Sequence, residues 1–374
     1  MSGPDKSVAF ALGGLGGSNS HGVGFLAAAQ EAEVEPELIS CTSGQIHWVA
    51  HYLEKRNLKK LLTEQIEQMP RLKPPFTEFS GLPLAIKGMP GVFKPAYLQH
   101  MMETWFQPPT TKEELLKRLF PARTMIPTRD PKFFKEISDT FNETPIAIFF
   151  NSVNPETGVE YVHVNAPARA FMANRYDMLG DELVAQRIAN GGTDVTFKTR
   201  ELRPITPEYV EAALWLLQYG FVKKFNGEYL FDGAYRRQLI VRELIGAETI
   251  FVVRPQSYKW QGDLPSTYFE MEDFKIEMLF NGSYGGETSS IRLLNYLHKQ
   301  RVIREEHYKP VELIEIEISV NRGFFDYFFE SLDIYEKSRN QTLARIAEWR
   351  AGCQCSCHET KPHLVRSAAG GNAA

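Results

Sequence analysis

Two short apolar runs within the first 53 residues constrain the fold more than any other feature of this chain. Val8–Leu12 (VAFAL) ends in the glycine-rich stretch 13–17, and a helical pattern follows it. Val34–Ser40 runs into the turn 41–44, after which apolar residues recur at helical spacing up to Leu53. Short apolar runs beside glycine are typical of strands buried on both faces. Strand, loop, helix and strand in this order form the crossover unit of a parallel sheet, so we expect an α/β fold.

Ser43 stands where a nucleophile could lie. A sharp turn from a strand into a helix lifts a serine hydroxyl clear of the backbone and directs it at a pocket. The usual wording of such a turn is Gly-x-Ser-x-Gly, whereas the outer positions here are Cys41 and Gln45. The alternative is that Ser43 caps the following helix. The turn by itself leaves both interpretations open.

The glycine-rich stretch 13–17 also has two interpretations. Glycine lets backbone N–H groups approach a ligand without a Cβ atom in the way. Such loops cradle phosphate, although Gly14-Leu15-Gly16-Gly17 fits the dinucleotide spacing only in part. They also form oxyanion holes, where backbone donors face developing negative charge. The loop and Ser43 both follow expected parallel strands, so both would lie at the carboxyl edge of the sheet, where α/β proteins place their active sites.

A turn in the second half of the chain presents a carboxylate. Asn226-Gly227 is typical of a tight turn, residues 229–231 predict a short strand, and Asp232-Gly233 predicts a second turn. Most Asp-Gly turns are structural, and for this pair taken alone we prefer that interpretation.

The rest of the sequence predicts one domain over residues 1–350 with two insertions, followed by a flexible tail at 351–374. Residues 54–141 predict a lid, because residues 71–95 within them are rich in Pro and Gly. In this region Met101, Met102, Trp105 and Phe106 line an acyl pocket or pack onto the core. Residues 255–309 predict an irregular insertion. We expect a hairpin at 145–151 and 159–164, helices at 175–188, 206–217 and 324–350, and strands at 247–254 and 311–319.

Composition narrows the classes of partner. The net charge of −4 argues against a nucleic-acid partner, which would show as a basic face. No apolar run approaches the roughly 20 residues of a spanning helix, and no signal segment is evident, so we expect a cytoplasmic protein, with peripheral membrane attachment as the alternative. Cys353, Cys355 and Cys357 are spaced more closely than structural zinc ligands, and we expect an exposed tail there rather than a metal site or acyl anchor.

Taken together, the three motifs resemble those of the patatin-like phospholipase family. That family carries Ala-Leu-Gly-Gly-Gly-Gly-x-Arg-Gly before a helix, and residues 11–19 here read ALGGLGGSN without a gap. Its Gly-Thr-Ser-Ala-Gly elbow matches residues 41–45, and its Asp-Gly-Gly/Ala turn matches residues 232–234. A Thr-Gly turn after a central strand matches Thr157-Gly158. The resemblance covers about residues 8–254.

The resemblance implies a three-layer sandwich around a mostly parallel sheet, with a helical lid insertion. It implies a Ser–Asp dyad in which Ser43 is the nucleophile and Asp232 its base, acting on phospholipid or lysophospholipid acyl esters without a metal or other cofactor. The implied oxyanion donors and substrate-binding backbone are those of Gly13, Gly14, Leu15, Gly16 and Gly44.

Some positions depart from the family pattern. The family's basic residue in the glycine loop falls at Ser18, and the elbow lacks both outer glycines. A non-catalytic relative that binds acyl lipid or a protein partner is therefore the alternative. His21 and His47 are expected at the surface or on the pocket wall rather than in a triad.

Overall fold

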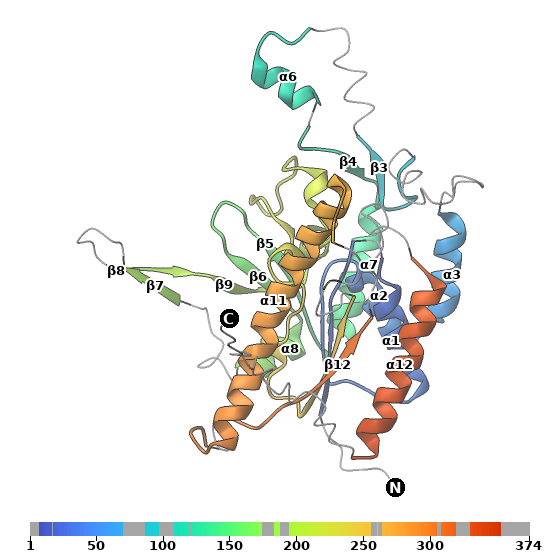
Figure 1. Cartoon of the computed structure of the whole chain (residues 1–374), viewed down its shortest axis with the longest axis vertical. Helices are drawn as coiled ribbons and strands as arrows, with labels where there is room; N and C mark the ends of the chain where they lie inside the picture. Colours follow the sequence, from blue (N-terminus) through green and yellow to red (C-terminus); the bar gives the residue numbers. More distant parts are fainter. Residues whose placement is uncertain are drawn as a thin grey trace, which may run out of the picture.

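The central sheet is mostly parallel and lies between two layers of helices (Figure 1). The computed structural model describes residues 7–16, 18–69, 87–96, 108–119, 121–173, 183–187, 194–255, 260, 264–304, 308–318 and 330–352. The strand order is β12-β11-β1-β2-β5-β6-β9, and β10 pairs with β5. These strands are β1 (Val8–Leu12), β2 (Leu38–Cys41), β5 (Ala147–Val153), β6 (Glu160–Val164), β9 (Arg200–Pro204), β10 (Phe231–Asp232), β11 (Thr249–Arg254) and β12 (Glu312–Glu317). Only the pairs β5–β6 and β5–β10 are antiparallel in this sheet, which confirms the predicted fold class.

Helices cover both faces of the sheet (Figure 1). They are α1 (Ser20–Glu31), α2 (Gln45–Leu53), α3 (Leu58–Gln68), α6 (Lys112–Leu119), α7 (Pro131–Glu143), α8 (Ala166–Ala173), α10 (Pro207–Ala213), α11 (Tyr268–Lys299) and α12 (Leu332–Arg350). Single 3-10 turns are η2 (Leu217–Tyr219), η3 (Gly233–Tyr235) and η4 (Arg242–Leu244), and two small sheets pair β3 (Phe93–Pro95) with β4 (Met125–Pro127) and β7 (Leu183–Arg187) with β8 (Asp194–Lys198).

Strand β1 shows why the sheet is buried on both sides. Side chains at its odd-numbered and even-numbered positions point to opposite faces of the sheet. Phe10 and Leu12 pack into a core shared with α1, α2 and α12, where Phe10 meets Phe25 edge-on at 4.8 Å between ring centroids. Ala9 and Ala11 face a second core that includes side chains of α8 and α11. The large residues on one face and the small residues on the other determine how closely each layer of helices packs against the sheet.

Two sequence predictions about secondary structure are wrong. The segment 255–309 is not irregular, because it contains the 32-residue helix α11. Three glycines inside α11 lower its intrinsic propensity, but Thr267 and Glu270 form a capping box at its start and Tyr284 is buried in the second core. The expected helix at 175–188 is also wrong, since β7 occupies its end and pairs antiparallel with β8.

Part of the expected lid is described. Residues 87–96 and 121–128 form the β3–β4 pair, and Met89 and Phe93 pack with Trp215, Tyr219 and other aromatic residues. Met101, Met102, Trp105 and Phe106 lie outside the described residues, as do Cys353, Cys355 and Cys357. The domain limits and the role of residues 54–141 as a lid stay predictions.

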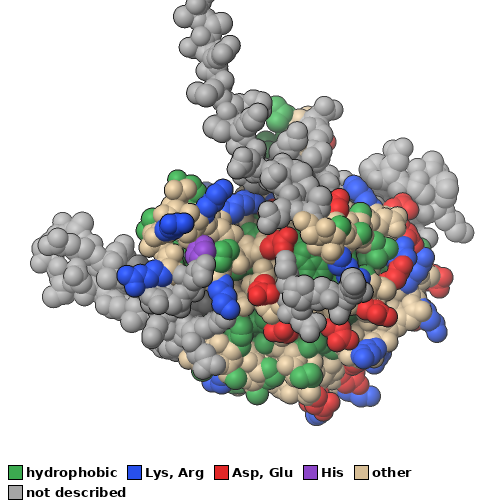
Figure 2. Space-filling model, turned by 90° about the horizontal axis from the view of Figure 1, so that it is seen from below, with side chains coloured by type: hydrophobic (Ala, Val, Ile, Leu, Met, Phe, Trp, Pro, Cys, Tyr) green, Lys and Arg blue, Asp and Glu red, His purple; other side chains and the backbone are tan. Residues whose placement is uncertain are grey.

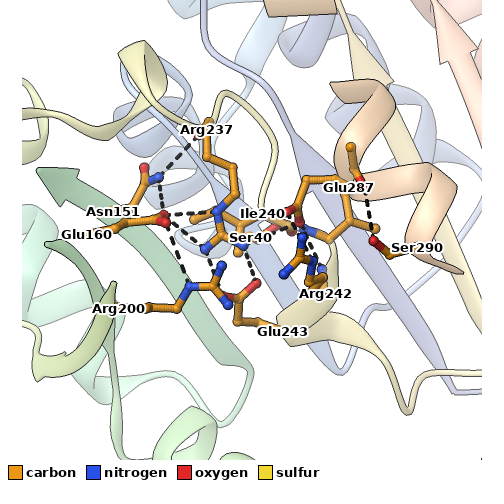
Figure 3. A network of polar contacts seen from close by, with 12 residues as sticks. Ser40, Asn151, Glu160, Arg200, Arg237, Ile240, Arg242, Glu243, Glu287 and Ser290 are labelled. Atoms are coloured by element: carbon orange, nitrogen blue, oxygen red, sulfur yellow. Dashed lines mark hydrogen bonds and ion pairs between the residues drawn. The ribbon is translucent and has the colours of Figure 1, made fainter. Parts of the chain in front are cut away.

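A buried cluster of charges fixes the segment that follows Asp232 (Figure 3). Arg237 contacts Glu160 of β6 at 2.9 Å, Glu243 at 2.7 Å and Glu287 of α11 at 3.3 Å. Arg200 of β9 reaches Glu243 at 3.3 Å. Burial opposes ionisation of Glu243, but Arg237 and Arg200 nevertheless lower its pKa to about 2. The segment is therefore tied at once to β6, β9 and α11.

We expect Arg237→Leu to cost about 3–5 kcal/mol of unfolding free energy, because it leaves several buried carboxylates without their shared cation. Urea unfolding measures this. The matched control is Arg345→Leu, which removes an exposed pair with Glu348 and should cost less than about 1 kcal/mol. Equal losses in the two variants would contradict the role given to the cluster.

Candidate active site

Ser43 occupies a strained turn between β2 and α2. Its φ is +50°, in the left-handed region that non-glycine residues rarely adopt. The N-cap of α2 is Gly44, and no side chain makes a capping hydrogen bond there, so Ser43 does not act as a helix cap. Holding a serine in this conformation costs about 1–3 kcal/mol. The strain marks Ser43 as a residue that the surrounding structure holds in place.

The elbow lacks its two outer glycines, and the surrounding structure compensates. Cys41 is fully buried in the core beside α1. The Gln45 side chain lies against α1, where a Cβ atom at Gly22 would be 2.2 Å from Gln45 Oε1. Gln45 Nε2 donates to the Asn19 carbonyl at 3.1 Å. Because Gly22 has no side chain, α1 leaves room for the Gln45 side chain at a position where the usual motif has glycine.

The glycine loop and the elbow approach each other at backbone distance. A Cβ atom at Gly14 would lie 2.2 Å from the Thr42 carbonyl oxygen and 2.7 Å from Ser43 Cβ. At Gly44 it would lie 2.2 Å from the side-chain nitrogen Nδ2 of Asn19 and 2.5 Å from the Gly16 carbonyl oxygen. Only glycine fits at these two positions. The loop is therefore packed directly beside the Ser43 hydroxyl.

Asp232 lies at the end of β10 and is buried with Ser43. Ser43 and Asp232 line the same cavity, and the Ser43 hydroxyl is placed to donate to the Asp232 carboxyl and so lowers its pKa. The Ala234 N–H donates to Asp232 Oδ1 at 2.9 Å. Burial raises the pKa of Asp232 to about 7, against the lowering effects of these two donors and of the Arg129 charge. The carboxyl group thus changes charge near neutral pH, as a general base should. The structure brings the two predicted dyad residues together.

The predicted oxyanion donors differ in availability. The Gly13 N–H is occupied by the Val253 carbonyl at 3.1 Å, and the Gly14 N–H by Thr42 Oγ1 at 3.0 Å. The Leu15 N–H makes a longer bond of 3.3 Å to Asn19 Oδ1. For the Gly16 and Gly44 N–H groups, the described residues provide no hydrogen-bond acceptor. The Gly13 and Gly14 N–H groups are therefore occupied in this structure, whereas those of Gly16 and Gly44 have no acceptor among the described residues.

Residues that the sequence did not single out hold the loop. Gln238 Nε2 donates to the Gly14 carbonyl at 2.9 Å, while Thr42 Oγ1 donates to the Gln238 carbonyl at 2.6 Å. Asn19 Nδ2 donates to the Gly16 carbonyl at 3.0 Å. No sequence motif marks Gln238, because its contacts depend on the chain path that Arg237 fixes. Asn19 stands where the motif that the sequence resembles has a glycine.

The two histidines near the motifs do not form a triad. His21 is fully buried, and its Nε2 lies 2.7 Å from the Gly13 carbonyl oxygen. Burial lowers the pKa of His21 to about 4. This residue supports the loop from beneath, so its predicted place at the surface or pocket wall is wrong. His47 does line a pocket, and burial lowers its pKa as well.

Two cavities meet at Ser43. The first, of about 90 Å³, contains Ser43 and Asp232, and its apolar walls include Leu216, Ile276 and Phe280. The second is lined by more polar residues, among them Arg129, His47, Tyr219 and Glu330, together with Ser43, Gly16 and Gly44. The serine thus lies between an apolar compartment and one whose lining has a larger polar share.

The second cavity contains two groups whose pKa burial alters. Arg129 has a lowered pKa because of burial, while the charge of Asp232 partly offsets this effect. Burial raises the pKa of Glu330 to about 7, although its Oε2 accepts a hydrogen bond from the Asn19 N–H at 2.8 Å. Arg129 comes from the chain just before α7 and was not identified from the sequence.

Neither a metal site nor a spanning helix is found in the described parts of the chain. Residues 7–16, 18–69 and the later described ranges contain no group of three or more His, Cys, Asp or Glu side chains placed to hold a metal ion. Within the same residues, no helix has the length and apolar character needed to cross a membrane.

No known protein family and no curated protein matches this sequence. Among solved structures, VipD from Legionella pneumophila is similar with a TM-score of 0.34 and 10% identity, over 93% of this chain and 68% of that one. Human GIVD cytosolic phospholipase A2, in complex with methyl gamma-linolenyl fluorophosphonate, is similar with a TM-score of 0.31 and 12% identity. That comparison covers 93% of this chain and 58% of the human enzyme.

We expect Ser43→Gly to be more stable than Ser43→Ala by about 1 kcal/mol, because glycine adopts positive φ without steric cost. The matched control is Ser290 inside α11, where the glycine variant should instead be less stable than the alanine variant by about 1 kcal/mol. Urea unfolding of the four variants measures both differences. The same sign at both positions would mean that the elbow is not strained.

Proposed function

We propose that this protein is a serine acyl hydrolase that cleaves lipid acyl esters of the phospholipid or lysophospholipid type through Ser43 and Asp232. The observation that carries the proposal is that Ser43, held at a φ of +50°, lines the same cavity as a buried Asp232 whose pKa is near neutral. A serine hydroxyl is a poor nucleophile until a base takes its proton. Here the base lies in the same cavity as the hydroxyl, which is placed to donate to it.

The first half of the reaction forms an acyl-enzyme. Asp232 takes the Ser43 proton as Oγ attacks the acyl carbon, and the carbonyl oxygen becomes a tetrahedral oxyanion. The free N–H groups of Gly16 and Gly44 are the donors for that oxyanion. When the tetrahedral intermediate collapses, the bond to the leaving alcohol breaks. Asp232 then returns its proton to the alcohol oxygen.

The second half regenerates the enzyme. Water gives a proton to Asp232 and attacks the Ser43 ester, and Asp232 then protonates Ser43 Oγ as the fatty acid leaves. The apolar cavity bounded by Leu216, Ile276 and Phe280 suits an acyl chain. Arg129 in the second cavity suits a leaving group that carries negative charge. These walls support lipid esters over small polar esters.

The second candidate function is binding of acyl lipid without turnover, which the altered elbow favours. Gly22 relieves the crowding that Gln45 would cause, and this contact weakens that alternative. Lipid that co-purifies with the protein, with no ester turned over, would favour the alternative.

We expect Ser43→Ala to lower the turnover of p-nitrophenyl esters by more than about 10³-fold. Asp232→Asn should lower it by about 10²–10⁴-fold, because it removes the general base. Steady-state kinetics measures both losses. Ser290→Ala on α11 and Asp139→Asn on α7 are the matched controls away from the cavity and should retain turnover. Wild-type turnover in Ser43→Ala would exclude the proposed mechanism.

The pH dependence of kcat/KM should follow Asp232. Its base form is the active one, so activity should rise with pH through a midpoint near 7. Arg129→Gln removes a positive charge that lowers this pKa and should move the midpoint to higher pH. The exposed Arg345→Gln is the control and should leave it unchanged. A midpoint near pH 4, or one that Arg129→Gln does not move, would argue against Asp232 as the base.

A further inference from the structure

A short protruding segment stands beside the mouth of the apolar cavity. Residues 221–224, here called the tip, read Phe-Val-Lys-Lys. Phe221 is 51% exposed and Val222 is 55% exposed, and both lysines are exposed as well. These two adjacent apolar side chains therefore face solvent and do not pack into the folded core. Their exposure therefore needs a partner or a function.

The tip is held rigidly at both ends. Before it, Trp215 Nε1 donates to the Gly220 carbonyl at 2.9 Å, and Gly220 has a φ of +69° that favours glycine. After it, Phe225 is fully buried and meets the Trp215 ring edge-on at 5.3 Å between centroids. Asn226 and Gly227 then turn the chain back with positive φ values. The fold thus fixes this pair of apolar side chains in an exposed position.

The tip is continuous with the cavity that contains Ser43. The Phe221 ring lies 6.3 Å from the Phe231 ring, and Phe231 lies 6.1 Å from Tyr235, which lines the cavity. Leu216 and Gln218, just before the tip, also line it, together with Phe280 of α11. In Figure 1 the upper end of α11 therefore marks the end of the molecule at which the cavity and the tip lie.

Of the two lysines in the tip, only Lys224 is available to attract an anionic surface. Lys223 is paired with Glu211 at 2.6 Å. Lys224 lies over the Tyr229 ring at 4.9 Å, and the described residues place no carboxylate in an ion pair with it. Apolar side chains beside a free lysine are the usual composition of a segment that enters the interface of an anionic bilayer.

The opposite end of the molecule differs. Figure 2 views the molecule from that side, and there acidic and basic side chains are exposed between small groups of hydrophobic ones. Helix α6 stands apart at the cavity end (Figure 1), and none of its residues is buried. Its leucines Leu115, Leu116 and Leu119 are exposed. Exposed apolar side chains thus occur on two separate elements at the end where the cavity opens.

We propose that the tip inserts Phe221 and Val222 into the headgroup region of a lipid surface that contains anionic lipid, and so brings the cavity mouth to its substrate. The partner inferred here rests on the proposed function, since a lipid ester must leave a bilayer or micelle to reach Ser43. A second copy of the chain fits less well as the partner. The area that two side chains can bury is far smaller than the roughly 1,000 Å² that a stable interface buries.

Co-sedimentation with phosphatidylcholine vesicles, with and without phosphatidylserine, tests the proposal. The full chain carrying Ser43→Ala is used, so that no lipid is consumed. We expect Phe221→Ser with Val222→Ser to lower vesicle binding by about tenfold or more. Lys224→Glu should lower it by at least about fivefold, and only on vesicles with phosphatidylserine. The matched controls are Val302→Ser and Lys299→Glu, exposed near the far end of α11, which should bind as the parent does.

The outcomes separate this proposal from the proposed function. With Ser43 intact, the tip variants should turn over a water-soluble short-chain p-nitrophenyl ester at the parental rate. Binding that depends on the tip, without any ester turnover, would support the lipid partner and refute the hydrolase. Vesicle binding that is absent, or unchanged in the tip variants, would overturn the lipid partner. A parental dimer that the tip variants dissolve, without vesicle binding, would also overturn it and indicate a second copy.

Discussion

The close approach of the glycine loop to the serine elbow is the constraint on which the site depends. Gly14 lies so near Thr42 that no Cβ atom fits between them. The Thr42 hydroxyl accepts a hydrogen bond from the Gly14 N–H and donates one to the Gln238 carbonyl, so it joins three segments of the chain. This contact fixes the loop beside Ser43 and occupies the Gly14 N–H, while the Gly13 N–H is bonded to the Val253 carbonyl. Among the described residues, the Gly16 and Gly44 N–H groups have no acceptor, and both residues line the second cavity. The same packing holds Ser43 at positive φ, a conformation that an isolated turn would abandon.

Buried charge is used in two different ways around this contact. The Arg237 cluster is fully paired, and it fixes the chain that carries Gln238 to the loop. Asp232 instead has a neutral hydroxyl and a backbone N–H as its partners, with the Arg129 charge nearby, so burial dominates and raises its pKa to about 7. Because protonated Asp232 is favoured in the folded state, this residue lowers stability as pH rises from its unfolded value towards 7. Such a cost is typical of a site where activity needs an ionisable group away from water.

The fold class could be predicted from the sequence because VAFAL and the run before Ser43 carry the signal of strands buried on both faces. Ser43 and Asp232 could be singled out only because the glycine loop and the two turns together resemble one family, since each turn taken alone also fits a structural role. Helix α11 was missed because its glycines weaken the local pattern, and only its capping box and its buried face reveal it. Gln238, Arg129 and the Gly22–Gln45 contact could not be predicted, because each depends on segments far apart in sequence. The sequence could not show that the Gly13 and Gly14 N–H groups are already bonded to Val253 and Thr42, because these bonds depend on the fold.

Peptide mapping by tandem mass spectrometry, after reaction with an alkyl fluorophosphonate, tests the central claim most directly. An activated serine is phosphonylated because a base removes its proton, whereas the other serines of the chain should stay unmodified. The account predicts a single adduct on Ser43 that forms more slowly below pH 7 and is lost in Asp232→Asn. An adduct on another serine, or labelling of Ser43 that is unchanged in Asp232→Asn, would contradict it.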